Sequence, residues 1–159
     1  GYEKYIGTRL DYHFTNKTAT PYTHKEEDEL GIKKTIMCHA ESEIKNSFNY
    51  KELDPSAGIL AFDFFLKREE YTRIALIGFD LFQQGKKVYY FKNEEFDPAV
   101  NWLWDLGYYD KEGNLTKKSL HDIDETYEYL NDMFDSNKDK KFYIFSTYPF
   151  TERDNLKVL

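Results

Sequence analysis

The stretch from residue 54 to residue 91 constrains the fold most, because it combines a small-residue turn, an apolar helix-like run and a strand in one continuous segment. It opens with a Pro-Ser-Ala-Gly turn at Pro55 and continues over 57–69 as an apolar run with helical spacing. An apolar segment over 73–79 then has the composition of a strand. A strand that is apolar almost throughout is typical of a parallel sheet covered on both faces. We therefore expect an α/β fold, a parallel sheet flanked by helices.

The start of this helix and the end of this strand are expected to face one crevice. A helix that begins in small residues exposes unpaired backbone N–H groups and a partial positive charge, which favours anions. Open α/β sheets place ligands at the carboxyl ends of their strands, here Gly78, Phe79 and Asp80. Ser56 is interpreted as a helix cap rather than a nucleophile, since serine is favoured at that position and no base adjoins it.

Further elements are expected around this unit. Segment 41–50 is either a short amphipathic helix or a loop. Asp63 falls among apolar helix positions and is expected at the rim, and the tail after Pro149 is expected at the periphery. Strands are predicted at 9–14, 32–39, 86–91 and 141–146, and helices at 99–106 and at 120–134, the latter capped by Ser119.

Composition narrows the classes of protein. The 159 residues and 40% hydrophobic content suit one domain with a core, and no run approaches the roughly 20 apolar residues of a membrane-spanning helix. A net charge of −7 argues against a nucleic-acid surface. The single cysteine, Cys38, lies in an apolar run, which indicates a buried structural thiol in a reducing compartment.

Among residues that could perform chemistry, His121 is the most suggestive. The histidines have no metal-ligand spacing, and the chain lacks a Walker loop, a G-x-G-x-x-G fingerprint and a G-x-S-x-G elbow. His121 precedes a helix, and a neighbouring carboxylate (Asp122, Asp124 or Glu125) could keep its ring basic. The alternative is an ordinary surface histidine. The aromatic doublet that ends at Tyr90 is either strand packing or a pair of hydroxyl donors to phosphate.

In chain order, four segments resemble the motifs of the sialyltransferases, both the eukaryotic Golgi enzymes and the bacterial lipooligosaccharide enzymes. The opening GYEKYIGTR resembles the second half of the long motif, and PSAGILA followed by IGFD resembles the short motif. Val88-Tyr89-Tyr90 is similar to the small motif, and His121 with its downstream acids is similar to the very short motif.

The resemblance implies a single Rossmann-like glycosyltransferase domain over 1–159, without the family's first strand and glycine-rich loop. The implied reaction is an inverting, metal-independent transfer of sialic acid from a CMP-activated donor to a glycan hydroxyl, as in lipopolysaccharide or capsule synthesis. No cofactor is implied beyond this co-substrate. The implied site has His121 as general base, Tyr89 and Tyr90 on the leaving phosphate, and Asn16, Ser56, Ala57, Gly58, Gly78, Phe79 and Asp80 around the donor.

Departures from the motifs keep other interpretations open. Val88 stands where animal enzymes have histidine, and Phe82 lies close to the position of a bacterial tyrosine but lacks its hydroxyl. The alternatives are a non-catalytic sugar-nucleotide-binding module, a transferase of another ulosonic acid such as Kdo, and a different nucleotide-linked chemistry. The expected partners are a nucleotide-sugar donor and a glycan acceptor, with no nucleic acid. The expected location is the cytoplasm, with peripheral association at the inner membrane face left open.

Overall fold

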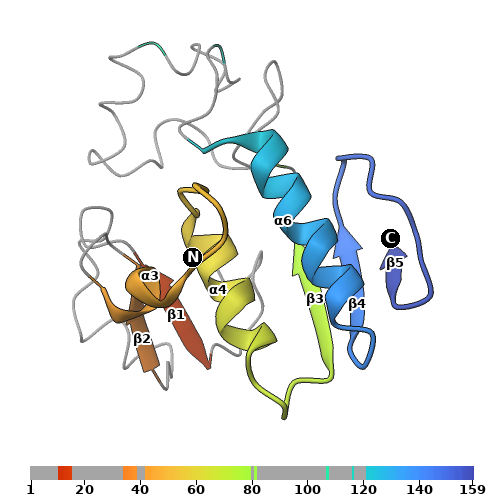
Figure 1. Cartoon of the computed structure of the whole chain (residues 1–159), viewed down its shortest axis with the longest axis horizontal. Coiled ribbons are helices and arrows are strands. Elements are labelled where there is room, and N and C mark those ends of the chain that lie inside the picture. Colours follow the sequence, from red (N-terminus) through yellow and green to blue (C-terminus); the bar gives the residue numbers. More distant parts are fainter. Residues whose placement is uncertain are drawn as a thin grey trace, which may run out of the picture.

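The computed structural model describes residues 11–15, 34–38, 42–79 and 121–159, together with positions 81, 107 and 116. These residues form a mixed α/β fold in which helices pack against two small parallel sheets (Figure 1). The predicted strand at 86–91 and the predicted helix at 99–106 lie outside the described residues.

The smaller sheet pairs β1 (Tyr12–Thr15) with β2 (Lys34–Met37) in parallel. Both strands fall within or overlap the segments predicted from the sequence. Cys38 follows β2 directly and is buried, as predicted. The ambiguous segment 41–50 contains α3 (Glu43–Ser47), a helix of little more than one turn that begins where Ser42 accepts a hydrogen bond from the Lys45 N–H.

The second helix, α4 (Ala57–Leu66), begins where the sequence predicts and ends three residues before the predicted end at position 69. The chain turns after it, with the Tyr71 N–H donating to the Arg68 carbonyl at 3.3 Å. Strand β3 (Arg73–Ile77) then starts as predicted but ends two residues early, because Gly78 adopts a φ of +74° that no strand residue has.

The larger sheet has the order β3-β4-β5, and every pair in it is parallel. Strand β4 (Lys141–Phe145) confirms the predicted strand at 141–146. Strand β5 (Leu156–Val158) corrects the prediction of a peripheral tail, since Leu156 is only 1% exposed. The tail joins the sheet as an edge strand, because it pairs with β4 and inserts the apolar side chain of Leu156 into the core.

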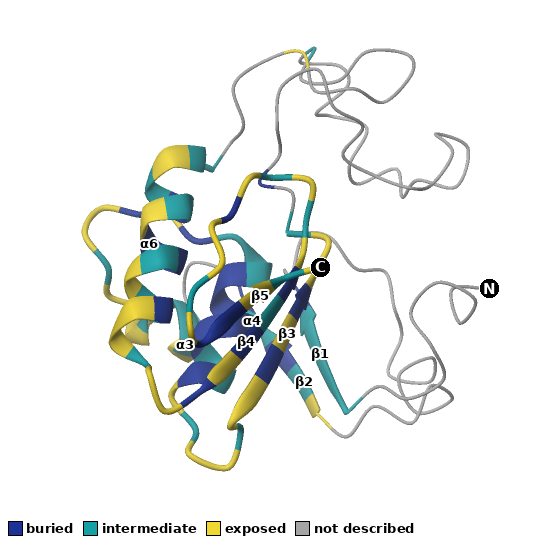
Figure 2. Ribbon diagram, turned by 90° about the vertical axis from the view of Figure 1, so that its right-hand side faces the viewer, coloured by how far each residue is buried: buried dark blue, intermediate teal, exposed yellow. Residues whose placement is uncertain are grey.

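One face of this sheet is buried and the other is exposed, which corrects the prediction of a strand covered on both faces. Exposure alternates along β3, with Ile74 and Leu76 buried and Ile77 75% exposed (Figure 2). Both α4 and α6 (Ile123–Ser136) cover the same face, since Phe62 of α4 and Phe134 of α6 lie with ring centroids 6.1 and 4.9 Å from Phe142. Apolar composition alone could not reveal that the described helices cover only one face.

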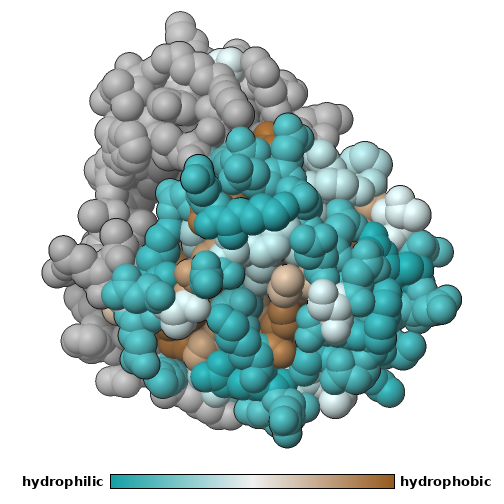
Figure 3. Space-filling model, viewed as in Figure 1, coloured by the Kyte–Doolittle hydropathy of each residue, from teal (hydrophilic) through white to brown (hydrophobic). Residues whose placement is uncertain are grey.

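Helix α6 begins at Ile123 with Asp122 as its cap, so the predicted start at 120 with a Ser119 cap is wrong. The Asp122 carboxylate accepts a hydrogen bond from the Glu125 N–H at 3.0 Å, which sets the first turn three residues later than expected. Its apolar positions face α4 and the sheet, and its acidic positions face outward. The coloured part of the surface in Figure 3 is accordingly mainly hydrophilic, with a smaller apolar patch near its centre.

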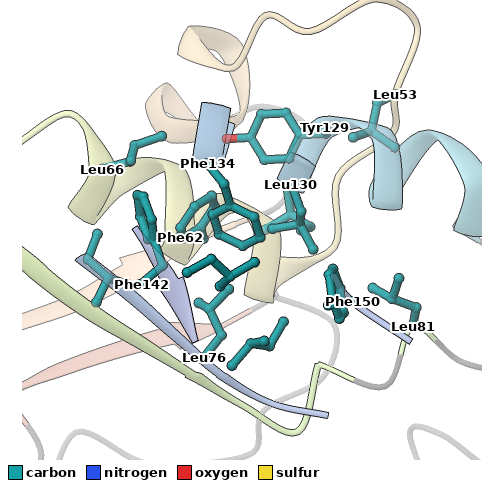
Figure 4. Close-up of a cluster of buried hydrophobic side chains, with 14 residues drawn as sticks. Leu53, Phe62, Leu66, Leu76, Leu81, Tyr129, Leu130, Phe134, Phe142 and Phe150 are labelled. Carbon is teal, nitrogen blue, oxygen red and sulfur yellow. The ribbon is translucent and has the colours of Figure 1, made fainter. Parts of the chain in front are cut away.

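The core lies between the two helices and the three-stranded sheet (Figure 4). Asp63 corrects a prediction here, because it is 6% exposed rather than at the rim. Its carboxylate accepts a hydrogen bond from the Tyr129 hydroxyl at 3.1 Å and pairs with the Lys67 ammonium at 2.6 Å. Burial, reinforced by the Asp63 charge, raises the pKa of the Tyr129 hydroxyl. The paired groups make a buried carboxylate tolerable.

Candidate functional site

The start of α4 exposes backbone N–H groups that have no hydrogen-bond acceptor within the helix. The Ser56 hydroxyl accepts from the Ile59 N–H at 3.3 Å, and the Ser56 carbonyl accepts from the Leu60 N–H at 3.0 Å. The N–H groups of Ala57 and Gly58 precede these bonds and therefore have no partner within the helix. The first turn of α4 contains no acidic residue. The positive end of the helix dipole is thus not neutralised by the helix's own side chains.

Gly58, at the start of α4, lies against Phe79, two residues after the end of β3. A Cβ atom at this position would lie 3.4 Å from the Phe79 ring, at the short limit of an ordinary van der Waals contact. The start of α4 therefore lies close to the Phe79 ring. The predicted convergence of helix start and strand end is present in the structure.

The turn after β3 contains two residues with positive φ. Gly78 has φ +74° and donates its N–H to the Phe145 carbonyl at 3.2 Å. Leu81 has φ +52° and is buried, although a branched side chain disfavours this region. Such strained residues cluster at functional sites, where the surrounding packing maintains them. Sequence reasoning missed Leu81, because nothing in its type signals a left-handed backbone.

Ser146, which directly follows β4, fixes the position of Phe79. Its hydroxyl donates to the Phe79 carbonyl at 2.6 Å and accepts from the Tyr148 N–H at 3.0 Å. Sequence reasoning missed this residue too. The available signal was a polar side chain at the carboxyl end of a buried strand, the position where α/β sheets bind ligands.

His121 lies beside the segment that leads into α4. Its Nδ1 is 3.1 Å from the carbonyl oxygen of Asp54, two residues before the Ser56 cap. A neutral imidazole that donates from Nδ1 to this carbonyl carries its lone pair on Nε2, the atom that could accept a proton. The Asp54 carboxylate pairs with the Lys45 ammonium of α3, and the Asp122 carboxylate caps α6.

The structure thus gathers six of the predicted site residues around the start of α4 and the end of β3. His121 joins this group through Asp54, which sequence reasoning did not single out. Those gathered are Ser56, Ala57, Gly58, Gly78, Phe79 and His121; the other predicted residues, Asn16, Asp80, Tyr89 and Tyr90, lie outside the described residues.

Two other features of the described residues bear on ligands. Within residues 11–15, 34–38, 42–79 and 121–159, no group of three or more His, Cys, Asp or Glu side chains could hold a metal ion. A separate pocket of about 490 Å³ lies between β2, α3 and the second half of α4, and Asp63 and Lys67 are among its lining residues. None of the predicted site residues in the described part of the chain lines this pocket.

Comparison of the chain with protein-family models, with curated proteins and with solved structures found no match.

Proposed function

We propose that this chain is a glycosyltransferase similar to the sialyltransferases, which transfers a sialic-acid-type sugar from a CMP-activated donor to a glycan hydroxyl. One observation carries the proposal. Residues from two of the four motif-like segments meet in space: Gly58 lies against Phe79 within the segment that resembles the short motif, and His121 contacts the carbonyl of Asp54 just before the α4 cap. The contact between His121 and Asp54 joins positions 67 residues apart in the chain, so local sequence preferences do not produce it and the tertiary fold does.

A Rossmann-like arrangement is part of this proposal. In the view of Figure 1 the strands follow one another in the order β2, β1, β3, β4, β5, and α4 contacts both β1 and β3. Doubly wound sheets of this order bind ligands where the strand order reverses, between β1 and β3. Asn16 directly follows β1 and Gly78 directly follows β3, so both predicted donor contacts follow strands that border this point.

The start of α4 suits the anionic part of the donor. Departure of CMP places negative charge on a phosphate oxygen, and backbone N–H groups at a helix start stabilise such charge without reorganising. The N–H groups of Ala57 and Gly58 are proposed for this role, which an acidic first turn would oppose and which the acid-free first turn of α4 supports. The hydroxyls of Tyr89 and Tyr90 are proposed as further donors to the same phosphate.

His121 is proposed as the general base. Its Nε2 accepts the proton of the acceptor hydroxyl as that oxygen attacks the anomeric carbon of the donor sugar. The bond from this carbon to the phosphate oxygen breaks, and its electron pair leaves with CMP. Attack from the side opposite CMP inverts the anomeric configuration. Contact between Nδ1 and the Asp54 carbonyl orients the ring for this step.

The cellular setting is also a proposal. Within the part of the chain that the structure describes, no helix has the length and apolar character needed to cross a membrane. We place the reaction in the cytoplasm, where CMP-activated sugars and a glycan acceptor at the inner membrane face would both be accessible.

The substitution His121→Asn tests the catalytic role. An asparagine amide can still donate to the Asp54 carbonyl but cannot act as a base. We expect CMP to bind the variant as it binds the natural chain, while release of CMP from CMP-sialic acid in the presence of acceptor slows by about 10²–10⁴-fold. Saturation transfer NMR measures binding, and CMP release measures turnover.

Three outcomes separate the alternatives. Absence of any CMP-induced shift at Ala57, Gly58 or Phe79 would contradict the proposal. Binding of CMP without sugar transfer or donor hydrolysis would favour a non-catalytic sugar-nucleotide-binding module. Turnover of CMP-Kdo, or of UDP- or GDP-linked sugars, in place of CMP-sialic acid would assign the same site to another donor.

A further inference from the structure

The face of the β3-β4-β5 sheet opposite α4 and α6 is uncovered in the described structure. Its apolar and its basic side chains lie at opposite ends of the face. Alternate residues of parallel strands point to the same face, and the exposed positions of the three strands follow this rule. We call this surface the open sheet face, and it is formed by Arg73, Ala75, Ile77, Lys141, Tyr143, Phe145 and Lys157.

The carboxyl end of the open sheet face is apolar. Ile77 and Phe145 are direct cross-strand partners, with 75% and 43% exposure. They are two of the exposed large hydrophobic residues in the part of the chain that the structure describes. Parallel sheets normally have both faces covered, since exposing such side chains forgoes their burial. This end of the surface therefore suits an apolar partner.

The amino end of the same face is basic. Arg73 and Lys141 are direct cross-strand partners, and Lys157 lies opposite Tyr143 in the next row. All three cations are exposed, in a chain whose net charge is −7. The Lys141 ammonium donates a hydrogen bond to the backbone carbonyl of Asp154 at 3.2 Å, and this acceptor carries no formal charge. Its positive charge is therefore not neutralised by that contact.

We propose that the open sheet face docks an amphipathic α-helix of a partner protein, antiparallel to the strands and with an acidic last turn. Apolar side chains of this helix cover Ile77 and Phe145, and its acidic C-terminal turn lies over Arg73 and Lys141. The polarity follows from electrostatics, because the carbonyl end of a helix is negative and attracts cations. Crossover helices on parallel sheets have the same antiparallel orientation.

The dimensions of the sheet set the length of this helix. A five-residue strand such as β3 spans roughly 16 Å at about 3.3 Å per residue. A helix rises about 1.5 Å per residue, so about 11 residues cover the strand. The apolar residues must therefore occupy the first two turns, and the acids the third.

A synthetic helical peptide of 14 residues, amidated at its C-terminus, tests the proposal. It carries a leucine stripe and three glutamates in its last turn, and it is titrated into the ¹⁵N-labelled full chain. We expect saturable amide shifts at Ala75, Ile77, Tyr143 and Phe145. A peptide with lysines in place of the glutamates should bind about tenfold more weakly, as lost and reversed surface ion pairs predict.

Protein variants provide the matched comparison. The double substitution Arg73→Glu with Lys141→Glu should weaken the glutamate peptide about tenfold and strengthen the lysine peptide. Lys138→Glu, which reverses an exposed cation outside the open sheet face, should change neither affinity. Circular dichroism establishes that each variant is folded.

Several results would overturn the proposal. One is the absence of saturable shifts on this face with the glutamate peptide. Another is equal affinity for the glutamate and lysine peptides. A third is self-association in analytical ultracentrifugation that Ile77→Thr with Phe145→Thr abolishes, since the face would then be occupied by a second copy. Binding to phosphatidylglycerol vesicles that the same pair of substitutions abolishes would assign the face to a membrane instead.

Discussion

The two long helices of the described structure are capped in the same way and differ in the charge of their first turns. Each has a side-chain cap, Ser56 for α4 and Asp122 for α6. The first turn of α6 carries Asp124 and Glu125, whereas the first turn of α4 carries no acid. The N-terminus of α6 is thus neutralised by its own residues, and that of α4 is left able to attract an external anion. This contrast is the physical basis for our proposal that a donor phosphate binds at the start of α4.

The helices also differ in how they pack. The side chains of α4 contact elements on several sides: Phe62 meets the larger sheet, Phe65 meets β1 and Asp63 meets α6. Helix α6 is buried on one side only, and its other side is acidic and exposed. The contrast shows that the helix closest to the candidate site is also the one that joins the two sheets.

The largest expected effect comes from Phe62→Ala in α4. Phe62 is fully buried between the rings of Phe134 and Phe142, so the truncation should lower the free energy of unfolding by about 3–5 kcal/mol. Urea denaturation measures this. Glu128→Ala on the exposed side of α6 is the control and should change stability by less than about 0.5 kcal/mol. A similar loss of unfolding free energy in Phe62→Ala and Glu128→Ala would contradict the proposed difference in packing between α4 and the exposed side of α6.

The next effect concerns the hydrogen bond that joins the two helices. Tyr129→Phe removes the hydroxyl that donates to the buried Asp63 carboxylate, which should cost about 1–3 kcal/mol. Thermal and urea unfolding measure the loss. Tyr127→Phe, a less buried ring of the same helix, should cost much less. If Tyr129→Phe left the free energy of unfolding unchanged, the ion pair with Lys67 alone would be enough to compensate the buried Asp63 carboxylate.

Removing either helix cap should lower the stability of the chain by a similar amount, but the two substitutions should differ in their effect on CMP affinity. Ser56→Ala and Asp122→Ala each remove an acceptor for a first-turn N–H, and each should cost about 1 kcal/mol. Only Ser56→Ala should also weaken the binding of CMP, because only the start of α4 is proposed to hold the phosphate. Parallel denaturation and CMP titrations measure both quantities. Equal effects on CMP affinity would remove the functional distinction between the caps.

Adding an acid to the first turn of α4 should affect stability and binding in opposite directions. Ala57→Glu complements the helix dipole and should stabilise the chain by about 0.3–1 kcal/mol. The same charge repels the donor phosphate, so CMP affinity should fall. Ala57→Gln is the uncharged control, measured by the same titrations. Unchanged CMP affinity in Ala57→Glu would place the phosphate elsewhere.

The smallest effect is a pH dependence at the end of α6. The Lys138 ammonium, followed by the Arg153 guanidinium, lowers the pKa of the Asp135 carboxyl. A lowered pKa favours the charged carboxylate in the folded chain. The resulting stability is therefore present above the unfolded pKa of about 3.9 and lost as pH falls through the folded pKa. NMR titration of Asp135 measures this shift, and Lys138→Ala should move the pKa upward. An unchanged pKa in that variant would reassign the shift to Arg153.

Much of the site could be predicted from the sequence because its signals are local. The Ser56 cap, the start of α4, the glycine after β3 and the strand at Lys141–Phe145 all depend on residues within a few positions of each other. The start of α6 was misplaced for a related reason. Both Ser119 and Asp122 are good caps, and only the packing of the helix selects between them.

The sequence by itself determined the mixed α/β class of the fold and the small-residue start of α4. The tertiary structure decided which distant residues meet: the contact of His121 with Asp54, the burial of Asp63 beneath Tyr129, and the pairing of β5 with β4. It also decided that, among the described elements, only one face of the larger sheet is covered by helices. The reason is physical, since local propensity acts over neighbouring residues, whereas burial depends on which elements stack on one another.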